Sequence, residues 1–205
     1  MPKLSLSSVR GLNATVSTPH YARSALKPGI VFHDGTPFDA RAVQQNFARV
    51  LDPAQGHNRA SLFEAIERVD VVDDRTVRIV TKYPFGAFEP TMAHVSAAIV
   101  SPATAAQFGK AFGKSAEATA GTGPYRVARW KKDLEVVLER NERYWGAKGK
   151  LRQIVYRPIP EAASRVIALE SGDVDVIDRV PPADLRRLEQ RGDVTVLRRV
   201  SNGAQ

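Results

Sequence analysis

The sequence predicts an α/β fold, and three observations support this prediction. Apolar residues repeat with a helical period in some segments and cluster in short β-rich runs in others. Near the carboxyl end, β-rich runs alternate with helical segments, which is typical of a mixed or parallel sheet flanked by helices. Hydrophobic residues make up 43% of the 205 residues, a share usual for folded domains, so a mostly disordered chain is excluded.

The amino-terminal residues 1–24 show no sustained helix or strand period, and we expect an irregular leader there. A turn is expected at 27–29, followed by a short apolar strand end at 30–32. The next segment is a loop in which the Asp34-Gly35 pair supplies a position with positive φ.

A helix is expected to begin after Asp39, whose carboxylate is a good N-cap. Its apolar residues fall at i, i+4, i+7 and i+8 and form one stripe: Val43, Phe47, Val50 and Leu51. The Asp52-Pro53 pair should end this helix, because a residue before proline is disfavoured in the helical region.

The middle of the chain alternates between short elements. A capping-box pattern at Ser61–Glu64 predicts a short helix that continues through Ile66, and the runs 69–72 and 76–80 predict a hairpin. A further helix is expected at 86–93 and a buried strand at 97–100. The remaining expected elements are a helix from Ser101 through Phe108, a loop at 109–120, strands at 125–130, 134–140, 152–157, 174–177 and 194–200, and helices after Pro160 and from Pro182.

The charge balance is basic, with 30 Lys and Arg against 22 Asp and Glu, a net charge of +8 and a pI near 10. Residues 1–27 hold four of the bases and no acid, which accounts for +4. The other bases and acids are interspersed, as on an ordinary arginine-rich globular surface. We therefore expect no nucleic-acid partner, although a basic regulatory protein remains an alternative.

Motifs for catalysis or metal binding are scarce. The chain has no cysteine, which excludes disulfides, thiolate metal sites and a cysteine nucleophile. The four histidines lack the helical spacing of a local metal site: His20, His33, His57 and His94. The G-T-G-P run at 121–124 leads into a strand and lacks the third glycine of a dinucleotide loop. We expect a protein without catalytic activity, cofactor or metal.

No segment has the ~20 apolar residues of a membrane-spanning helix, so no direct membrane insertion is expected. The amino terminus also lacks the apolar run of ~7–15 residues typical of a secretory signal peptide.

Several motifs together resemble family 5 of the bacterial extracytoplasmic solute-binding proteins, which are receptors of ABC importers for dipeptides, oligopeptides, glutathione and nickel. The resemblance covers about residues 25–205. It is carried by the following runs: K-P-G-I-V-F-H-D-G-T-P-F-D-A-R-A-V at 27–43, N-F-A-R at 46–49, G-T-G-P-Y at 121–125, R-N-E-R-Y-W-G at 140–146, Ile159-Pro160 and E-S-G-D-V-D at 170–175.

The resemblance implies part of one lobe of a type II periplasmic-binding-protein fold, with a mixed sheet, flanking helices and the second lobe absent. It implies a smaller α/β subdomain at 25–118 and part of the main lobe at 119–205. Members are typically more than twice this length and begin with an export signal, so we expect a fragment. One lobe leaves the cleft open to water, where a hydrogen bond contributes little net energy, and binding should be weakened.

The function implied is the substrate-binding component of an ABC importer for dipeptides, oligopeptides or related small solutes. The implied partners are a peptide or small-molecule ligand and the permease subunits, and the implied compartment is the periplasm. The alternative is a basic regulatory or nucleic-acid-binding protein built on a solute-sensor fold. Nickel-type relatives commonly have an arginine near 97–100, where this chain has none, which weakens the nickel interpretation.

Two residues are predicted to face a ligand, His94 and Phe63, with ordinary packing as the alternative for both. The motif residues are expected to be architectural, because a tight turn needs them whatever the ligand. Alternatives for them are an acid/base pair at His33 and Asp34 and ligand stacking on the two aromatic residues. The full motif set is His33, Asp34, Gly35, Gly121, Thr122, Gly123, Pro124, Tyr144 and Trp145.

Overall fold

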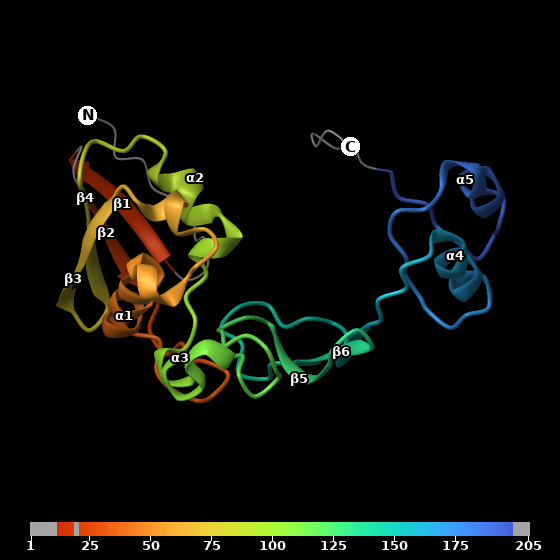
Figure 1. The fold of residues 1–205 in the computed structure, drawn as a ribbon, viewed down its shortest axis with the longest axis horizontal. Helices are drawn as coiled ribbons and strands as arrows, with labels where there is room; N and C mark the ends of the chain where they lie inside the picture. The colour runs from red at the N-terminus through yellow and green to blue at the C-terminus, as the bar shows by residue number, and fades with distance from the viewer. Residues whose placement is uncertain (1–11, 19–20, 199–205) are drawn as a thin grey trace. The chain divides into compact units, whose positions relative to one another are not determined.

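The computed structural model describes residues 12–18 and 21–198, which divide into two compact units (Figure 1). The first unit ends at Tyr156 and contains both β-sheets. The second unit begins at Arg157 and contains two helices. The α/β class expected from the sequence is confirmed.

The first sheet has four antiparallel strands in the order β1-β2-β4-β3. Its strands are β1 (Leu12–Thr18), β2 (Tyr21–Leu26), β3 (Ile66–Asp73) and β4 (Thr76–Thr81). The β3–β4 hairpin is the one that the sequence predicts, and Val69 pairs with Ile79 in its register.

The prediction of an irregular leader over residues 1–24 is wrong for the strands β1 and β2. Residues 1–11 and 19–20 lie outside the described part of the chain. In β2, every second side chain is buried, at Ala22, Ser24 and Leu26. Two of these three inward residues are small or polar, so the period of 2 does not stand out as an apolar alternation in the sequence.

Helix α1 (Ala40–Leu51) packs against β3 and β4 of the first sheet (Figure 1). The Asp39 carboxylate caps it by accepting a hydrogen bond of 2.8 Å from the Ala42 amide. The predicted stripe is buried at Val43, Phe47 and Val50, and the helix ends at Asp52 as expected. The apolar stripe thus directs the helix onto the sheet and forms the core.

Two pairs of aromatic rings lie within this core. Phe47 meets Phe63 edge to face at 5.8 Å, and Phe32 meets Phe38 in the same way at 5.7 Å. The segment before Phe63 is a single 3₁₀ turn, η2 (Ala60–Phe63), and not the helix expected from the capping box. The chain enters β3 at Ile66, because the sheet pairing of this residue replaces further helical turns.

The strand expected at 97–100 is also not formed. A 3₁₀ turn, η3 (Val95–Ala97), is followed by extended backbone whose amides bond outside any sheet. The Val100 amide donates to Asn46 Oδ1 at 3.4 Å, and the Ser101 amide donates to the Ala120 carbonyl at 3.0 Å. A side chain and a loop thus satisfy the groups that a neighbouring strand would have satisfied.

Helices α2 (Phe88–Ala93) and α3 (Pro102–Phe108) and the three strands of the second sheet agree with the sequence, whereas two further 3₁₀ turns in the first unit were not expected from it. Ser101 caps α3 by accepting from the Thr104 amide at 3.2 Å. The expected domain boundary near residue 118 falls between the two sheets and stays a prediction. These elements are η1 (Pro53–Gln55), α2 (Phe88–Ala93), α3 (Pro102–Phe108), η4 (Gly109–Ala111) and an antiparallel second sheet in the order β5 (Tyr125–Lys131), β6 (Glu135–Arg140) and β7 (Gln153–Tyr156).

The second unit contains α4 (Ala162–Glu170) and α5 (Pro182–Glu189), each with one fully buried apolar residue, Val166 and Leu188. The strands expected at 174–177 and 194–200 are absent among the described residues, so the mixed sheet expected for the carboxyl end does not form there. Within residues 157–198 neither segment has a pairing partner, and Val176 and Leu197 are 83% and 89% exposed. Residues 199–200 of the second predicted strand lie outside the described part of the chain.

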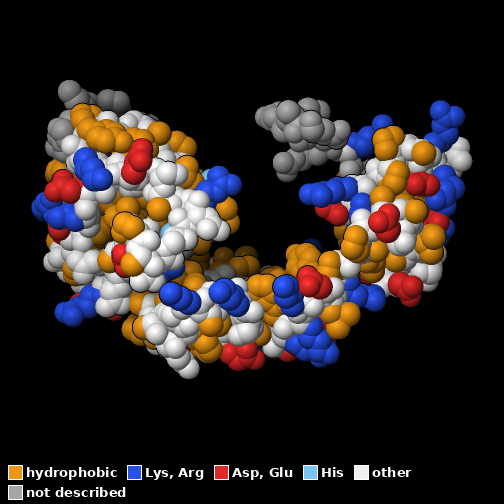
Figure 2. Space-filling model, in the orientation of Figure 1, with side chains coloured by type: hydrophobic (Ala, Val, Ile, Leu, Met, Phe, Trp, Pro, Cys, Tyr) orange, Lys and Arg blue, Asp and Glu red, His pale blue; other side chains and the backbone are white. Residues whose placement is uncertain are grey.

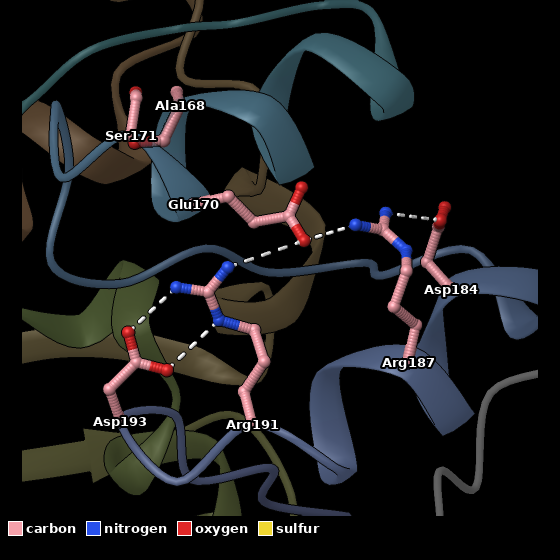
Figure 3. A network of polar contacts seen from close by, with 7 residues as sticks. All are labelled: Ala168, Glu170, Ser171, Asp184, Arg187, Arg191 and Asp193. Carbon is pink, nitrogen blue, oxygen red and sulfur yellow. Dashed lines mark hydrogen bonds and ion pairs between the residues drawn. The ribbon is translucent and has the colours of Figure 1, made fainter.

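A network of ion pairs joins the end of α4 to α5 and the loop after it (Figure 3). Glu170 bonds to the Arg187 guanidinium and lies 3.6 Å from Arg191. Arg187 also pairs with Asp184 at 2.8 Å, and Arg191 pairs with Asp193 at 2.7 Å. The hydrogen bond from Arg187 lowers the pKa of Glu170. Because the network is exposed, its effect on stability is screened by solvent.

The basic residues do not form a single patch on the face shown in Figure 2, because acidic side chains lie among them over each unit. Among the described residues, no helix has the length and apolar character needed to cross a membrane.

The burial of Phe63 generates a stability prediction. Phe63→Ala removes a ring with 0% exposure that packs edge to face on Phe47, and should lower the free energy of unfolding by about 3–5 kcal/mol. Urea denaturation measures this change. Tyr83→Ala is the control, because Tyr83 is 47% exposed and should cost less than about 1 kcal/mol. Equal losses in the two variants would contradict the assignment of Phe63 to the core.

Candidate functional site

A cavity of about 600 Å³ lies in the first unit where three motif-bearing loops meet. Its wall is mostly apolar and aromatic, and its lining contains no Asp, Glu, Lys or Arg. The principal lining residues are His33, Phe38, Ile99, Val100, Phe112, 119–125, Val127, Tyr144 and Trp145. This size and character suit a small apolar group.

His33 holds the segment that forms the cavity wall. Its amide donates to the Gly121 carbonyl at 2.9 Å, and its Nε2 lies 3.0 Å from the Gly123 carbonyl. Its Nδ1 accepts from the Gly121 amide at 3.4 Å. These bonds assign the proton to Nε2, since Nδ1 faces a donor and Nε2 faces an acceptor. His33 therefore holds the backbone at Gly121 and Gly123 in place through its side chain and its amide.

Two residues of the 140–146 motif hold the same segment from the other side. Asn141 Nδ2 donates to the Gly123 carbonyl at 3.1 Å, and the Asn141 amide donates to the Pro124 carbonyl at 2.8 Å. Trp145 Nε1 donates to the Thr122 carbonyl at 3.1 Å. The carbonyls of three consecutive residues are thus satisfied by groups from distant loops, which fixes the path of the wall.

Asp34 organises the loop next to His33. Its carboxylate accepts hydrogen bonds from the Thr36 amide at 3.0 Å, from Thr36 Oγ1 at 2.7 Å, from Thr104 Oγ1 at 2.6 Å and from Ser101 Oγ. Partial burial by itself would raise the pKa of Asp34, but these four bonds outweigh it and lower the pKa to about 2. The carboxylate therefore ties the loop to the first turn of α3.

The residue after Asp34 must be compatible with a left-handed backbone, and Gly35 adopts φ of +88°. Its amide donates to the Phe32 carbonyl at 2.9 Å, which closes the turn. This geometry agrees with the architectural role expected for the Asp-Gly pair.

The two aromatic residues of the 140–146 motif lie side by side in the wall. The ring centroids of Tyr144 and Trp145 are 5.2 Å apart. The Lys27 ammonium lies 4.6 Å from the centre of the Trp145 ring, so a cation packs on the indole. The indole is fixed by this contact and by its bond to Thr122, and it presents a defined surface to the cavity.

The structure brings some of the predicted residues together and separates others. His33, Gly121 to Pro124, Tyr144 and Trp145 all line the cavity, whereas Asp34 and Gly35 support it without lining it. Phe63 lies in the core with 0% exposure, where it cannot contact a ligand. His94 is half-buried, and its Nδ1 accepts from the Ser96 amide at 3.1 Å to cap η3.

Sequence reasoning missed the apolar part of the wall, which comes from Phe38, Ile99 and Phe112. It also missed the hydrogen bond from the Asn141 side chain to the Gly123 carbonyl, although Asn141 belongs to the 140–146 motif. An asparagine that follows a strand and precedes a turn was the available indication of a side chain bonded to backbone. Within residues 12–18 and 21–198, no group of three or more potential metal ligands of the His, Cys, Asp or Glu types is present.

Comparison with protein families matches residues 22–205 to the middle part of the bacterial extracellular solute-binding proteins, family 5. A glutathione-binding protein of Pectobacterium atrosepticum, GsiB, is 36% identical over 173 residues, which are 84% of this chain and 33% of that protein. A probable D,D-dipeptide-binding periplasmic protein of Escherichia coli, DdpA, is also 36% identical over 173 residues, 83% of this chain and 33% of that protein. The chain thus spans about a third of the length of these relatives.

Solved structures show the same fold. NikA from Brucella suis, in complex with Fe(III)-EDTA, superimposes with a TM-score of 0.74 and 28% identity over 86% of this chain and 36% of that one. A dipeptide-binding protein from Pseudoalteromonas, in complex with Met-Leu, gives a TM-score of 0.76 at 23% identity over 86% of this chain and 39% of that one. The fold of this chain is therefore that of part of a type II periplasmic binding protein, as the sequence predicts.

The hydrogen bonds of Asp34 generate a prediction about acid stability. The pKa of Asp34 is about 4 in the unfolded chain and about 2 in the folded chain. Its carboxylate therefore stabilises the fold fully above pH 4, and this stabilisation is lost as the pH falls towards 2. Asp34→Asn should therefore lower the free energy of unfolding by about 1 kcal/mol at pH 7, a value reduced for the exposure of this residue. The difference should shrink as the pH falls from 4 to 2.5.

Urea denaturation across this pH range measures the difference. Asp74→Asn is the matched control, since it removes the same charge from the exposed β3–β4 turn and should leave the acid dependence unchanged. A constant difference between Asp34→Asn and the unsubstituted protein at every pH would show that the charge of Asp34 is not responsible.

Proposed function

This chain belongs to the bacterial extracellular solute-binding proteins, family 5, and we propose that it forms part of the receptor of an ABC importer for dipeptides, oligopeptides or related small solutes. The family is one of binding receptors rather than enzymes. The proposal places the receptor in the periplasm, with the permease subunits of the importer as its protein partner.

The observation that supports a solute of this class is the uncharged, aromatic cavity at the junction of the family motifs. A cavity of about 600 Å³ accommodates an apolar side chain, and its walls offer Tyr144 and Trp145 for contact. Burial of such a side chain contributes roughly 1.5–3 kcal/mol. This favours a peptide or peptide-like solute over an inorganic ion, because an ion would require charged or coordinating groups in the wall.

The rigidity of the wall also supports a binding role. The carbonyls of Thr122, Gly123 and Pro124 are already bonded within the protein, so the wall does not have to reorganise when a solute enters. A preformed wall reduces the entropic cost of binding. Because the cavity carries no charge, the charged termini of a peptide remain in water there. The side-chain contribution of roughly 1.5–3 kcal/mol then corresponds to a dissociation constant on the order of 10 mM for dipeptides and this chain alone.

Tryptophan fluorescence tests the proposal, because the chain has two tryptophans and only Trp145 lines the cavity. In Trp130→Phe, titration with leucyl-leucine should produce a saturable change in emission from Trp145. In Trp145→Phe, the remaining Trp130, which is 40% exposed on β5, should show no saturable change. Glycyl-glycine serves as the comparison solute without an apolar side chain and should bind at least 5-fold more weakly.

The proposal fails if Trp130→Phe shows no saturable change up to about 5-fold above the expected dissociation constant. It also fails if both tryptophan variants respond equally, since the response would then not come from the cavity.

A further inference from the structure

A second cavity of about 590 Å³ lies between α1 and α3. Charged side chains line it, whereas none lines the first cavity. Asn46 and Arg49 of α1 form one side of it, and both sit one helical turn apart on the same face. The other side is apolar and is made of Val100, Pro102, Ala105 and Ala106. Val100 also lines the first cavity, so the two cavities are neighbours.

Arg49 forms no ion pair with any described carboxylate. Among the described residues, no carboxylate lies within 4 Å of its guanidinium. The group is half-buried, and burial lowers the pKa of Arg49. The central carbon of the guanidinium lies 5.5 Å from the centre of the Phe112 ring, a distance typical of a cation–π contact.

Asn46 is 2% exposed, and its carbonyl end is already occupied. Asn46 Oδ1 accepts from the Val100 amide at 3.4 Å and from Arg49 Nη2 at 3.4 Å. Two donors remain buried without a partner within the described part of the chain, Asn46 Nδ2 and Arg49 Nε. This corner therefore has an excess of donors and a positive charge, and it lacks an acceptor.

The nearest acid of the lining does not supply that acceptor. Asp52 Oδ1 accepts from the Ala54 amide at 2.9 Å, and Asp52 Oδ2 accepts from Gln55 Nε2 at 3.1 Å. Both of its oxygens thus take part in capping η1, and the carboxylate keeps its negative charge in the cavity lining. Burial and the charge of Arg49 lower the pKa of His57.

We propose that the second cavity binds a small organic carboxylate, with its oxygens paired to the Arg49 guanidinium and the Asn46 amide and its aliphatic part against the alanine-lined wall of α3. The planar fork of arginine matches the two oxygens of a carboxylate. The lining holds one base, Arg49, and one acid, Asp52. A carboxylate adds a single negative charge beside them, whereas a phosphate adds about −1.5 to −2 at neutral pH and is repelled more strongly by Asp52.

This site is separate from the peptide-binding function proposed for the first cavity, and neither proposal requires the other. Arg49 and Asn46 do not line the first cavity, and Trp145 does not line the second. Calorimetric titration of the 205-residue chain with sodium propionate tests the carboxylate site, with inorganic phosphate and sodium chloride as the other two probes.

We expect saturable propionate binding, phosphate binding at least 5-fold weaker and no heat beyond dilution with chloride. Arg49→Gln should weaken propionate binding at least 10-fold. Arg41→Gln is the matched control, because it removes the same charge from the exposed side of α1 and should change the affinity less than 2-fold. Circular dichroism checks that both variants are folded.

Ala106→Phe provides a test that leaves Arg49 in place and keeps the proposal falsifiable if Arg49→Gln does not fold. The larger side chain fills the cavity from an exposed position of α3, and propionate affinity should again fall at least 10-fold. The proposal is overturned if the unsubstituted chain does not bind propionate saturably, if phosphate binds as tightly, or if Ala106→Phe binds propionate unchanged.

Discussion

Residues 121–124 lead into β5 of the second sheet and belong to no strand themselves. Their carbonyls therefore receive no hydrogen bonds from a neighbouring strand. Residues 121–123 are only partly exposed, and a carbonyl that is shielded from water without a donor is costly, so groups from other loops satisfy these carbonyls. His33, Asn141 and Trp145 do this from two other loops. The position of the second sheet relative to α1 and the first sheet depends on these bonds, because the crossing segment is where the two parts of the first unit are joined.

The same constraint determines the chemistry of the binding surface. Because the carbonyls of 122–124 are used internally, the wall of the first cavity offers aromatic and aliphatic surface and few free polar groups. Charged side chains line the second cavity instead, where Arg49 and Asp52 are both present. The two cavities share Val100, and Phe112 lines the first cavity while it contacts the Arg49 guanidinium.

Local patterns predicted those parts of the fold whose cause lies within a few residues. Asp39 and Ser101 are caps that bond within their own helices, and the β3–β4 hairpin closes over a short turn. The failures have a common cause. Strand β2 buries Ala22 and Ser24, which are not recognisable as core residues without the strands beside them. Residues 174–177 are β-rich but lack a partner among residues 157–198.

The sequence by itself determined the α/β class, the family motifs and the residues suited to tight turns, because each depends on local conformational preference or on a contiguous run of letters. Only the tertiary structure decided that His33 meets Gly123, 90 positions away, that Phe63 lies in the core and that Arg49 and Asp52 line one cavity. Such contacts depend on how separate elements pack, and burial and pairing across the chain cannot be read from the spacing of residues along it.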